Sequence, residues 1–175
     1  MPNKLVKNSM IQHKSLKLRI YPTEEQSLLI NQTFGCCRKL YNEHLQERNE
    51  FYIENILPIK NKASQAEINQ IYRTFNPKTE KEWKEVYPYM KEVSSYSLQQ
   101  ARMDCDQAFV NFFKSNKGTR KGKSGFPKFK SKKDNRQSYR EPNVNGNAQI
   151  HFEKRFVKIA KVGKVQFKDR QFPKW

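Results

Sequence analysis

A strongly basic segment, residues 114–133, divides this chain into two parts that must fold differently. It holds nine Lys or Arg and no Asp or Glu, and its three glycines are followed by Phe126, Pro127 and Phe129. A disordered linker has little use for two aromatic residues around a proline, whereas a loop that grips phosphates and docks on a folded body has. We therefore expect nucleic-acid contact here; the alternative is a solubilising or linking segment.

The positive charge of the chain is concentrated after this boundary. The net charge is +18 over 175 residues, but residues 1–113 hold 16 basic and 13 acidic side chains, whereas residues 114–175 hold 19 and 4. The second part carries a field that calls for a polyanion. A membrane surface would also satisfy it, but there is no apolar run long enough to span a bilayer and no signal-peptide core near Met1. We expect a nucleic-acid partner and no membrane.

Residues 23–113 have the period of amphipathic helices. Three capping boxes predict helix starts: Thr23 with Gln26, Ser64 with Glu67, and Thr79 with Glu82. Prolines 58, 77 and 88 predict the stops, and Gly35 predicts a kink or a close backbone approach. The expected buried residues are Ile30, Phe34, Cys37, Tyr41 and Leu45; Ile68, Ile71, Tyr72 and Phe75; Trp83, Val86 and Tyr87; and Leu98, Ala101, Cys105, Ala108, Phe109, Phe112 and Phe113.

Before and after these helices in the sequence, apolar and polar residues alternate with a period of two. Leu16, Leu18 and Ile20 predict a strand that ends at Tyr21–Pro22, and residues 149–152, 156–159 and 162–167 predict three more. Lysines 158, 161, 164 and 168 are expected on the exposed side of the sheet. The sequence therefore predicts an α+β fold with a bundle of about four helices.

No catalytic or metal-binding cluster is evident. Histidines 13, 44 and 151 are isolated on different elements, and Asp104 and Asp106 are expected to be a solvated pair on one helix. Cys36, Cys37 and Cys105 fit neither a disulfide framework nor a CxxC clamp; the first two are interpreted as small buried residues of a reduced, cytosolic protein. We expect no catalytic residue, no metal and no cofactor.

A binding constellation remains. Lysine and arginine neutralise phosphates, while Phe126, Phe129 and Tyr139 offer rings on which unpaired bases can rest. The alternative is that these aromatic side chains pin the loop to the core.

Four ordered strings resemble successive N-terminal blocks of the TnpB (OrfB) family of bacterial insertion sequences: residues 19–45 (RIYPTEEQSLLINQTFGCCRKLYNEHL), 91–114 (KEVSSYSLQQARMDCDQAFVNFFK), 121–140 (KGKSGFPKFKSKKDNRQSYR) and 159–167 (IAKVGKVQF). The resemblance implies a relative of type V CRISPR effectors that binds a guide RNA and cleaves DNA next to a short motif. The older description of the helical block is a helix-turn-helix DNA-binding domain of a transposase.

The resemblance also implies an architecture. Residues 1–22 would be a tail and the first strand of a wedge β-barrel of oligonucleotide-binding type, residues 23–113 an inserted helical recognition domain, and residues 114–175 the basic loop and the remaining strands of an incomplete barrel. Residues 95–99 match the start of the motif-reading helix, with Tyr96 and Gln99 as base contacts, and Asn145 matches a wedge loop. Alternatively, Ser95 only caps the helix and Asn145–Gly146 only makes a turn.

The expected nucleic-acid-binding residues are Tyr96, Gln99, Lys117, Arg120, Lys121, Lys123, Lys128, Lys130, Lys132, Lys133, Arg136, Tyr139, Arg140 and Asn145. The family's RuvC-like nuclease and zinc ribbon have no counterpart in this chain, so we expect binding of guide RNA and motif-adjacent DNA without cleavage. The chain would then be a truncated product, a cloned fragment or one piece of a split protein. The expected location is the bacterial cytoplasm, with the nucleoid. The alternatives are a stand-alone DNA-binding repressor and a structural protein of a ribonucleoprotein.

Overall fold

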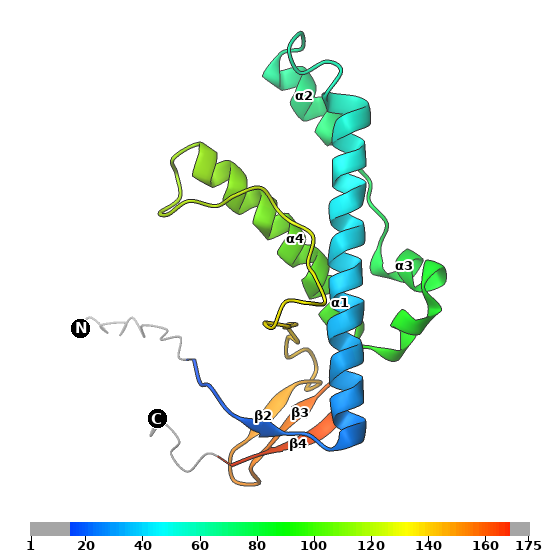
Figure 1. The fold of residues 1–175 in the computed structure, drawn as a ribbon, viewed down its shortest axis with the longest axis vertical. Helices are drawn as coiled ribbons and strands as arrows, with labels where there is room; N and C mark the ends of the chain where they lie inside the picture. Colours follow the sequence, from blue (N-terminus) through cyan, green and yellow to red (C-terminus); the bar gives the residue numbers. More distant parts are fainter. Residues whose placement is uncertain (1–14, 169–175) are drawn as a thin grey trace, which may run out of the picture.

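The computed structural model describes residues 15–168 and has an α+β architecture. Its elements are β1 (Ile20–Tyr21), α1 (Glu24–Phe51), a π-helical turn (Tyr52–Ile56), α2 (Gln65–Tyr72), α3 (Glu80–Val86), a 3-10 helix (Pro88–Glu92), α4 (Ser95–Asn116), β2 (Gln149–His151), β3 (Phe156–Ile159) and β4 (Gly163–Phe167). In Figure 1, α1 runs along the molecule, with α2 at one end and the sheet at the other. The expected α+β class and its four α-helices are confirmed, and the strands of the described residues form one four-stranded sheet.

Helix α1 begins at the predicted capping box. The Thr23 hydroxyl accepts the Gln26 backbone N–H at 3.2 Å, and the Gln26 side chain accepts the Thr23 N–H at 3.1 Å. The helix continues unbroken through Gly35, where an added Cβ would meet only the Arg38 guanidinium at 4.0 Å, so the expected kink or close approach is wrong. No neighbouring backbone comes near this side of the helix.

The buried stripe of α1 differs from the predicted one, because four further residues are buried and two of the predicted ones are not. Cys37, Tyr41 and Leu45 are buried as expected, together with Thr33, Cys36, Leu40 and His44, but Ile30 and Phe34 are only half-buried. Both α3 and α4 contribute to the core on this stripe, so it buries more residues than a single partner would cover.

The predicted starts of α2 and α3 are confirmed. Glu67 accepts the Ser64 N–H at 2.7 Å, and Glu82 accepts the Thr79 N–H at 2.7 Å. Their predicted burial is mostly wrong: α2 has no buried residue, Tyr72 is exposed, and in α3 only Trp83 is buried while Val86 is exposed. Helix α2 lies beyond the end of α1 and away from α3 (Figure 1), so one side of it faces solvent.

The core lies where α4 crosses α1. Leu98 and Ala101 of α4 join Cys36, Cys37 and Leu40 of α1 and Trp83, Met90 and Val93, and a second cluster joins Cys105 and Phe109 to Tyr41 and Leu45. The predicted burial of Leu98, Ala101, Cys105 and Phe109 is therefore confirmed, whereas Ala108 is only half-buried. Beyond Phe109, Phe112 is half-buried and Phe113 is 47% exposed, because α4 diverges from α1 there (Figure 1).

The sheet is antiparallel, in the order β1-β4-β3-β2. The helices thus lie in the chain between two strands that pair with each other, Ile20 opposite Phe167 and Tyr21 opposite Gln166. The three late strands are confirmed. The first is mostly wrong: residues 15–19 form no strand, because pairing with β4 covers two residues only, and residues 11–14 lie outside the described part.

The two faces of the sheet differ in polarity. By register, Ile20, Val157, Val165 and Phe167 share one face, and Val165 and Phe167 are buried. The other face carries Tyr21, His151, Phe156, Lys158 and Lys164. Lysines 158, 161, 164 and 168 are all exposed, as expected.

Within residues 15–168, no helix is both long enough and apolar enough to cross a lipid bilayer.

Candidate nucleic-acid interface

The basic loop is docked on α1 at its middle. The Asn42 side chain donates to the Lys130 carbonyl at 3.0 Å and accepts the Lys130 backbone N–H at 2.8 Å. Pro127 is buried, and Phe126 meets Phe109 and Phe112 edge-on at 5.4 and 5.3 Å. Phe126 and Pro127 therefore attach the loop to the helices, while Phe129 remains 54% exposed.

Most of the predicted phosphate-binding cations in this loop are exposed. Within the described residues none of these forms an ion pair: Lys117, Arg120, Lys121, Lys123, Lys128, Lys132, Lys133 and Arg136. Two other predicted cations have partners inside the protein. The Lys130 ammonium lies 4.2 Å from the centre of the Tyr41 ring, and the Arg140 guanidinium is bound to the Asp104 carboxylate.

Tyr139 is an anchor in this structure. Its ring meets Phe34 edge-on at 5.5 Å and packs against the larger core cluster. Burial, with the Glu141 carboxylate and the Cys37 thiol, raises the pKa of Tyr139 to about 12. The ring thus holds the chain after the basic loop against α1.

A groove of about 530 Å³ separates the start of α4 from the turn between β3 and β4. Ser95 and Tyr96 line one side, and Asn147, Lys158 and Lys161 line the other. The cap of α4 is Ser94, whose hydroxyl accepts the Ser97 N–H at 3.5 Å, so the alternative in which Ser95 caps the helix is wrong. Ser95 instead accepts a hydrogen bond from the Lys84 ammonium at 2.5 Å.

Two other predicted contacts lie near this groove but do not line it. Gln99 is exposed on α4, one turn after Ser95. Asn145 is exposed with a φ of 51°, in the left-handed region, and Gly146 follows with a φ of 75°. The Lys158 ammonium donates to the Gly146 carbonyl at 3.0 Å and holds this turn on the sheet. The turn predicted for Asn145–Gly146 is therefore present.

Glu141, which the sequence did not single out, joins the two sides of the groove. Its carboxylate accepts hydrogen bonds from the hydroxyls of Ser94 at 2.9 Å and Ser97, and from the Asn147 amide at 2.7 Å. Asn147 in turn accepts the Val144 backbone N–H at 2.5 Å. The proximity of an acid to two serines at a helix start was not detectable, because 44 residues separate Glu141 from Ser97.

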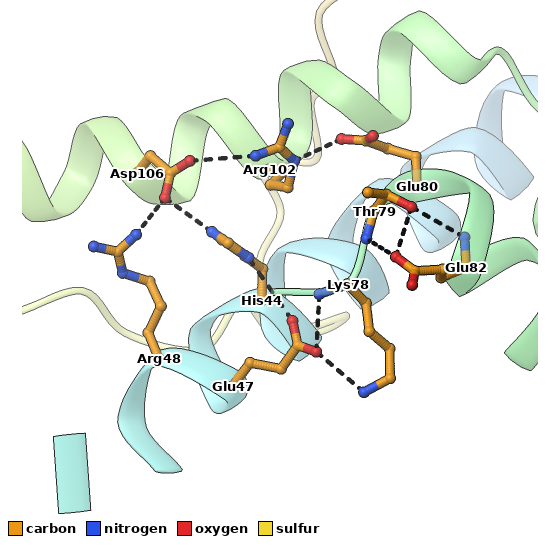
Figure 2. Close-up of polar contacts among 9 residues, drawn as sticks. All are labelled: His44, Glu47, Arg48, Lys78, Thr79, Glu80, Glu82, Arg102 and Asp106. Carbon is orange, nitrogen blue, oxygen red and sulfur yellow. Dashed lines mark hydrogen bonds and ion pairs between the residues drawn. The ribbon is translucent and has the colours of Figure 1, made fainter. Parts of the chain in front are cut away.

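Asp106 is the centre of a charged network between α1 and α4 (Figure 2). One carboxylate oxygen lies 2.8 Å from Nε2 of His44 and 2.5 Å from the Arg48 guanidinium, and the other lies 3.8 Å from Arg102. Arg102 also binds Glu80 at 2.6 Å. The expectations of a solvated Asp104–Asp106 pair and an isolated His44 are wrong, since Asp104 binds Arg140 and His44 is buried.

The electrostatics of this network favour the ionised acid. Although partial burial acts to raise the pKa of Asp106, the hydrogen bond from His44 and the charges of His44, Arg48 and Arg102 lower it. The network joins α4 to α1 and, through Arg102 and Glu80, to α3, while Arg48 also lines an apolar opening between the helices.

The cysteines are buried and free, and burial raises the pKa of both Cys37 and Cys105 to about 12. They pack as small apolar residues, as expected for Cys36 and Cys37. Among residues 15–168 there is no group of three or more His, Cys, Asp or Glu that could hold a metal ion.

Known proteins resemble this chain over most of its length. The family model of the helix-turn-helix domain of IS605 OrfB proteins matches residues 10–56. A Streptomyces pristinaespiralis protein named "Putative RNA-guided DNA endonuclease" is 33% identical over 125 residues, which are 71% of this chain and 27% of that protein. Virulence protein VsdF of Salmonella dublin is 33% identical over 119 residues, which are 68% of this chain and 93% of that protein.

The structure of the matched segment differs from what the name helix-turn-helix describes. Over residues 15–56 the structure has β1, the single uninterrupted helix α1 and the π-helical turn, and the next helix, α2, begins at Gln65. The family match and the two relatives nevertheless agree with the four sequence strings quoted above, and the chain belongs to the OrfB/TnpB family of insertion-sequence proteins.

Proposed function

We propose that this chain is the nucleic-acid-binding part of an RNA-guided DNA endonuclease, in which it holds guide RNA and contacts a DNA duplex beside a short motif. The observation that carries the proposal is the groove between α4 and the β3–β4 turn. Tyr96 on one side and Asn147, Lys158 and Lys161 on the other come from distant parts of the sequence. An open groove with hydroxyl, amide and ammonium groups in its lining suits a phosphate backbone with base edges beside it.

The start of α4 would read the duplex. Gln99 and Tyr96 are exposed on successive turns, where an amide can bond an adenine edge with two hydrogen bonds and a ring can press on a thymine methyl. Asn145 projects from the neighbouring turn, and Lys158 and Lys161 would bind phosphates. These residues would position the duplex against the start of a rigid helix.

The basic loop and the sheet would hold RNA. The eight exposed cations of residues 117–136 that form no ion pair among the described residues supply the counter-charge. At the sheet, the Arg19 guanidinium and the Lys168 ammonium lie 5.6 and 5.2 Å from the centre of the Tyr21 ring. The pairing of β1 with β4 supports an insertion of the helices between strands of one sheet. On this proposal the chain divides into residues 1–22, 23–113 and 114–175, and the strands would belong to a wedge barrel of oligonucleotide-binding type.

The name of the Streptomyces relative supports an RNA-guided activity for the longer protein, of which this chain spans 27%. We assign binding and positioning to this chain and no catalytic residue. A bacterial, nucleoid-associated location follows from the same proposal.

The second candidate function is a self-standing DNA-binding protein. It is favoured by the Salmonella relative, because the chain covers 93% of that protein and the shared region therefore occurs with little else attached. The two candidates differ in one measurable property, which is affinity for RNA.

The test uses a pool of DNA duplexes with a randomised central segment and, separately, a structured RNA from an insertion-sequence end. We expect enrichment of a short motif and RNA binding that weakens steeply as salt rises. Gln99→Ala should relax the motif at one base, at a cost of about 1–3 kcal/mol, and leave RNA affinity unchanged. The matched control is Gln107→Ala, an exposed glutamine of the same helix away from the groove.

Binding that is absent or insensitive to salt would refute the proposal. Enrichment of a duplex motif without RNA affinity would favour the self-standing DNA-binding protein.

A further inference from the structure

An apolar opening in the described part of the molecule lies at the far end of the helices from the sheet. It has a volume of about 510 Å³ and lies between the C-terminal half of α1, the C-terminal half of α4, the end of α2 and the basic loop. Volumes of roughly 300–1,000 Å³ are typical of sites that bind small molecules. We call it the aromatic groove.

Eight of the eleven side chains that line the aromatic groove are aromatic, and the only aliphatic one is Ile53. Phe113 and Phe126 are 47% and 49% exposed, although both touch neighbouring rings. Flat rings with open faces are surfaces on which unpaired bases can stack. The composition of the lining therefore suits a flat aromatic ligand.

A cation lies among these rings. The Arg48 guanidinium is 4.4 Å from the centre of the Phe109 ring and 5.4 Å from that of Phe75, and Asp106 holds it in place. A guanidinium fixed over an aromatic wall can stack on a base or bond its acceptor edge. The Asn49 side chain and the Tyr52 and Tyr72 phenols add hydrogen-bonding groups to the same lining.

The charge around the groove is uneven. Lys123 and Lys128 flank Phe126 in the loop and Lys114 follows Phe113; all three are exposed and form no ion pair among the described residues. The end of α1 instead carries Glu50, and the π-helical turn after it carries Glu54. A bound polyanion would therefore run along α4 and the loop, with its apolar parts directed into the groove.

We propose that the aromatic groove binds unpaired bases of a single-stranded RNA segment, whose phosphates follow Lys114, Lys123 and Lys128. RNA is the occupant to which we commit, because unpaired bases are available in RNA loops and because amide and phenol groups in the lining can bond a ribose 2′-hydroxyl. The inference rests on the proposed function and adds to it a defined site for bases, separate from the groove at the start of α4.

The test uses the full chain and a short single-stranded RNA that carries 5-iodouridine. Long-wavelength irradiation cross-links this base to an aromatic ring stacked on it, and mass spectrometry of the peptides should locate the cross-link at Phe113 or Phe126. Phe113→Leu keeps an apolar side chain but removes the ring, and should weaken RNA binding about 5-fold to 100-fold in fluorescence anisotropy. Phe113→Trp should retain binding.

Val110→Ala is the matched control, since Val110 is 42% exposed on the same helix and does not line the groove. It should leave RNA affinity and the cross-link unchanged. Because Phe113 and Val110 are both exposed, circular dichroism should show the same helix content in all three variants.

Each of the other possible outcomes contradicts a specific part of the proposal. RNA binding with a steep salt dependence, but with cross-links elsewhere and no effect of Phe113→Leu, overturns this inference and leaves the proposed function intact. Absence of RNA binding overturns both. Equal affinity for single-stranded DNA of the same sequence overturns the choice of RNA. A change in oligomeric state caused by Phe113→Leu, with RNA affinity unchanged, would make the groove a protein interface.

Discussion

The helical region, residues 24–116, and the basic region, residues 117–168, hold their charged side chains differently. In the helical region ion pairs link separate elements, as Asp106 does with Arg48 and Glu80 with Arg102. In the basic region, Arg140 is paired, with Asp104 of α4, and the other described cations form no ion pair. The helices thus use charge to hold themselves together, whereas the basic region keeps its charge available for a partner.

The two regions also differ in their apolar cores. The helical region has two buried clusters that join α1, α3 and α4. The described part of the basic region buries Pro127, Phe156, Val162, Val165 and Phe167. Stability is therefore expected to depend mainly on the helices and affinity mainly on the basic region, which mutations can test separately.

The largest effect on stability should come from Leu98→Ala. Leu98 is fully buried where α4 meets α1 and α3, and truncation in such a core costs about 3–5 kcal/mol. Urea denaturation measures the loss. Leu28→Ala is the control, because Leu28 is 70% exposed and its truncation should change stability by about 0.5 kcal/mol or less. Equal losses of stability in the two variants would mean that Leu98 is not part of the stabilising core.

The complementary change is the combined replacement of Lys121, Lys123 and Lys128 by Ala. These exposed side chains form no ion pair among the described residues, so the free energy of unfolding should stay nearly constant. The slope of the logarithm of RNA affinity against the logarithm of salt concentration should fall by about 3.

Lys78→Ala is the paired-cation control for that triple variant. Lys78 binds Glu47 at 3.2 Å, so its loss should cost stability modestly, by up to about 1 kcal/mol, and leave the salt slope as it was. A triple variant that is less stable but binds RNA with unchanged affinity would mean that these lysines contribute to stability and not to binding.

Asp106→Asn should weaken the attachment of α4 to α1 by about 1–2 kcal/mol. The value is below that for a fully buried pair because the carboxylate is partly exposed and screened. The pKa of Asp106 is lowered in the fold, so its contribution is complete above the ordinary value of 3.8 and is lost as pH falls through the lower, folded pKa. As pH falls through this acidic range, the free energy of unfolding measured by denaturation should therefore decrease more steeply for the wild type than for Asp106→Asn. The same pH dependence in both proteins would contradict the assignment.

The smallest effects on stability are expected from removing the capping residues of α3 and α2, which have similar capping boxes but differ in burial. Thr79→Ala removes the cap of α3, which buries Trp83, and should lower global stability by about 1 kcal/mol. Ser64→Ala removes the same bond from α2, which buries no residue. There, amide hydrogen exchange within α2 should accelerate while global stability changes little. A global loss from Ser64→Ala would mean that α2 contributes more to the fold than its exposure indicates.

The features predicted correctly from the sequence are those encoded over a few residues. Each capping box needs only a hydroxyl and a Glu or Gln three positions later, and the helices begin after Thr23, Ser64 and Thr79 as expected. The late strands follow from alternation over four or five residues, and the excess of lysine in the loop is a matter of composition. Local hydrogen bonding and periodicity are present in the chain before it folds.

The features that were missed depend on residues distant in sequence. Asp106 meets His44 across 62 positions, and Glu141 meets Ser97 across 44. The exposure of α2 and the shortness of β1 depend on where neighbouring elements end. The aromatic groove is a further case, because the pattern on α4 predicts that Phe112 and Phe113 are buried.

For this protein the sequence by itself determined where the helices start, which segments form the late strands, and that a basic loop joins the helical and sheet-forming parts. Only the tertiary structure decided which charges are neutralised and which aromatic rings remain open. The physical reason is that both depend on the angle at which α4 crosses α1. Near the crossing Asp106 reaches His44 and Arg48, and beyond it the helices diverge and Phe113 remains 47% exposed.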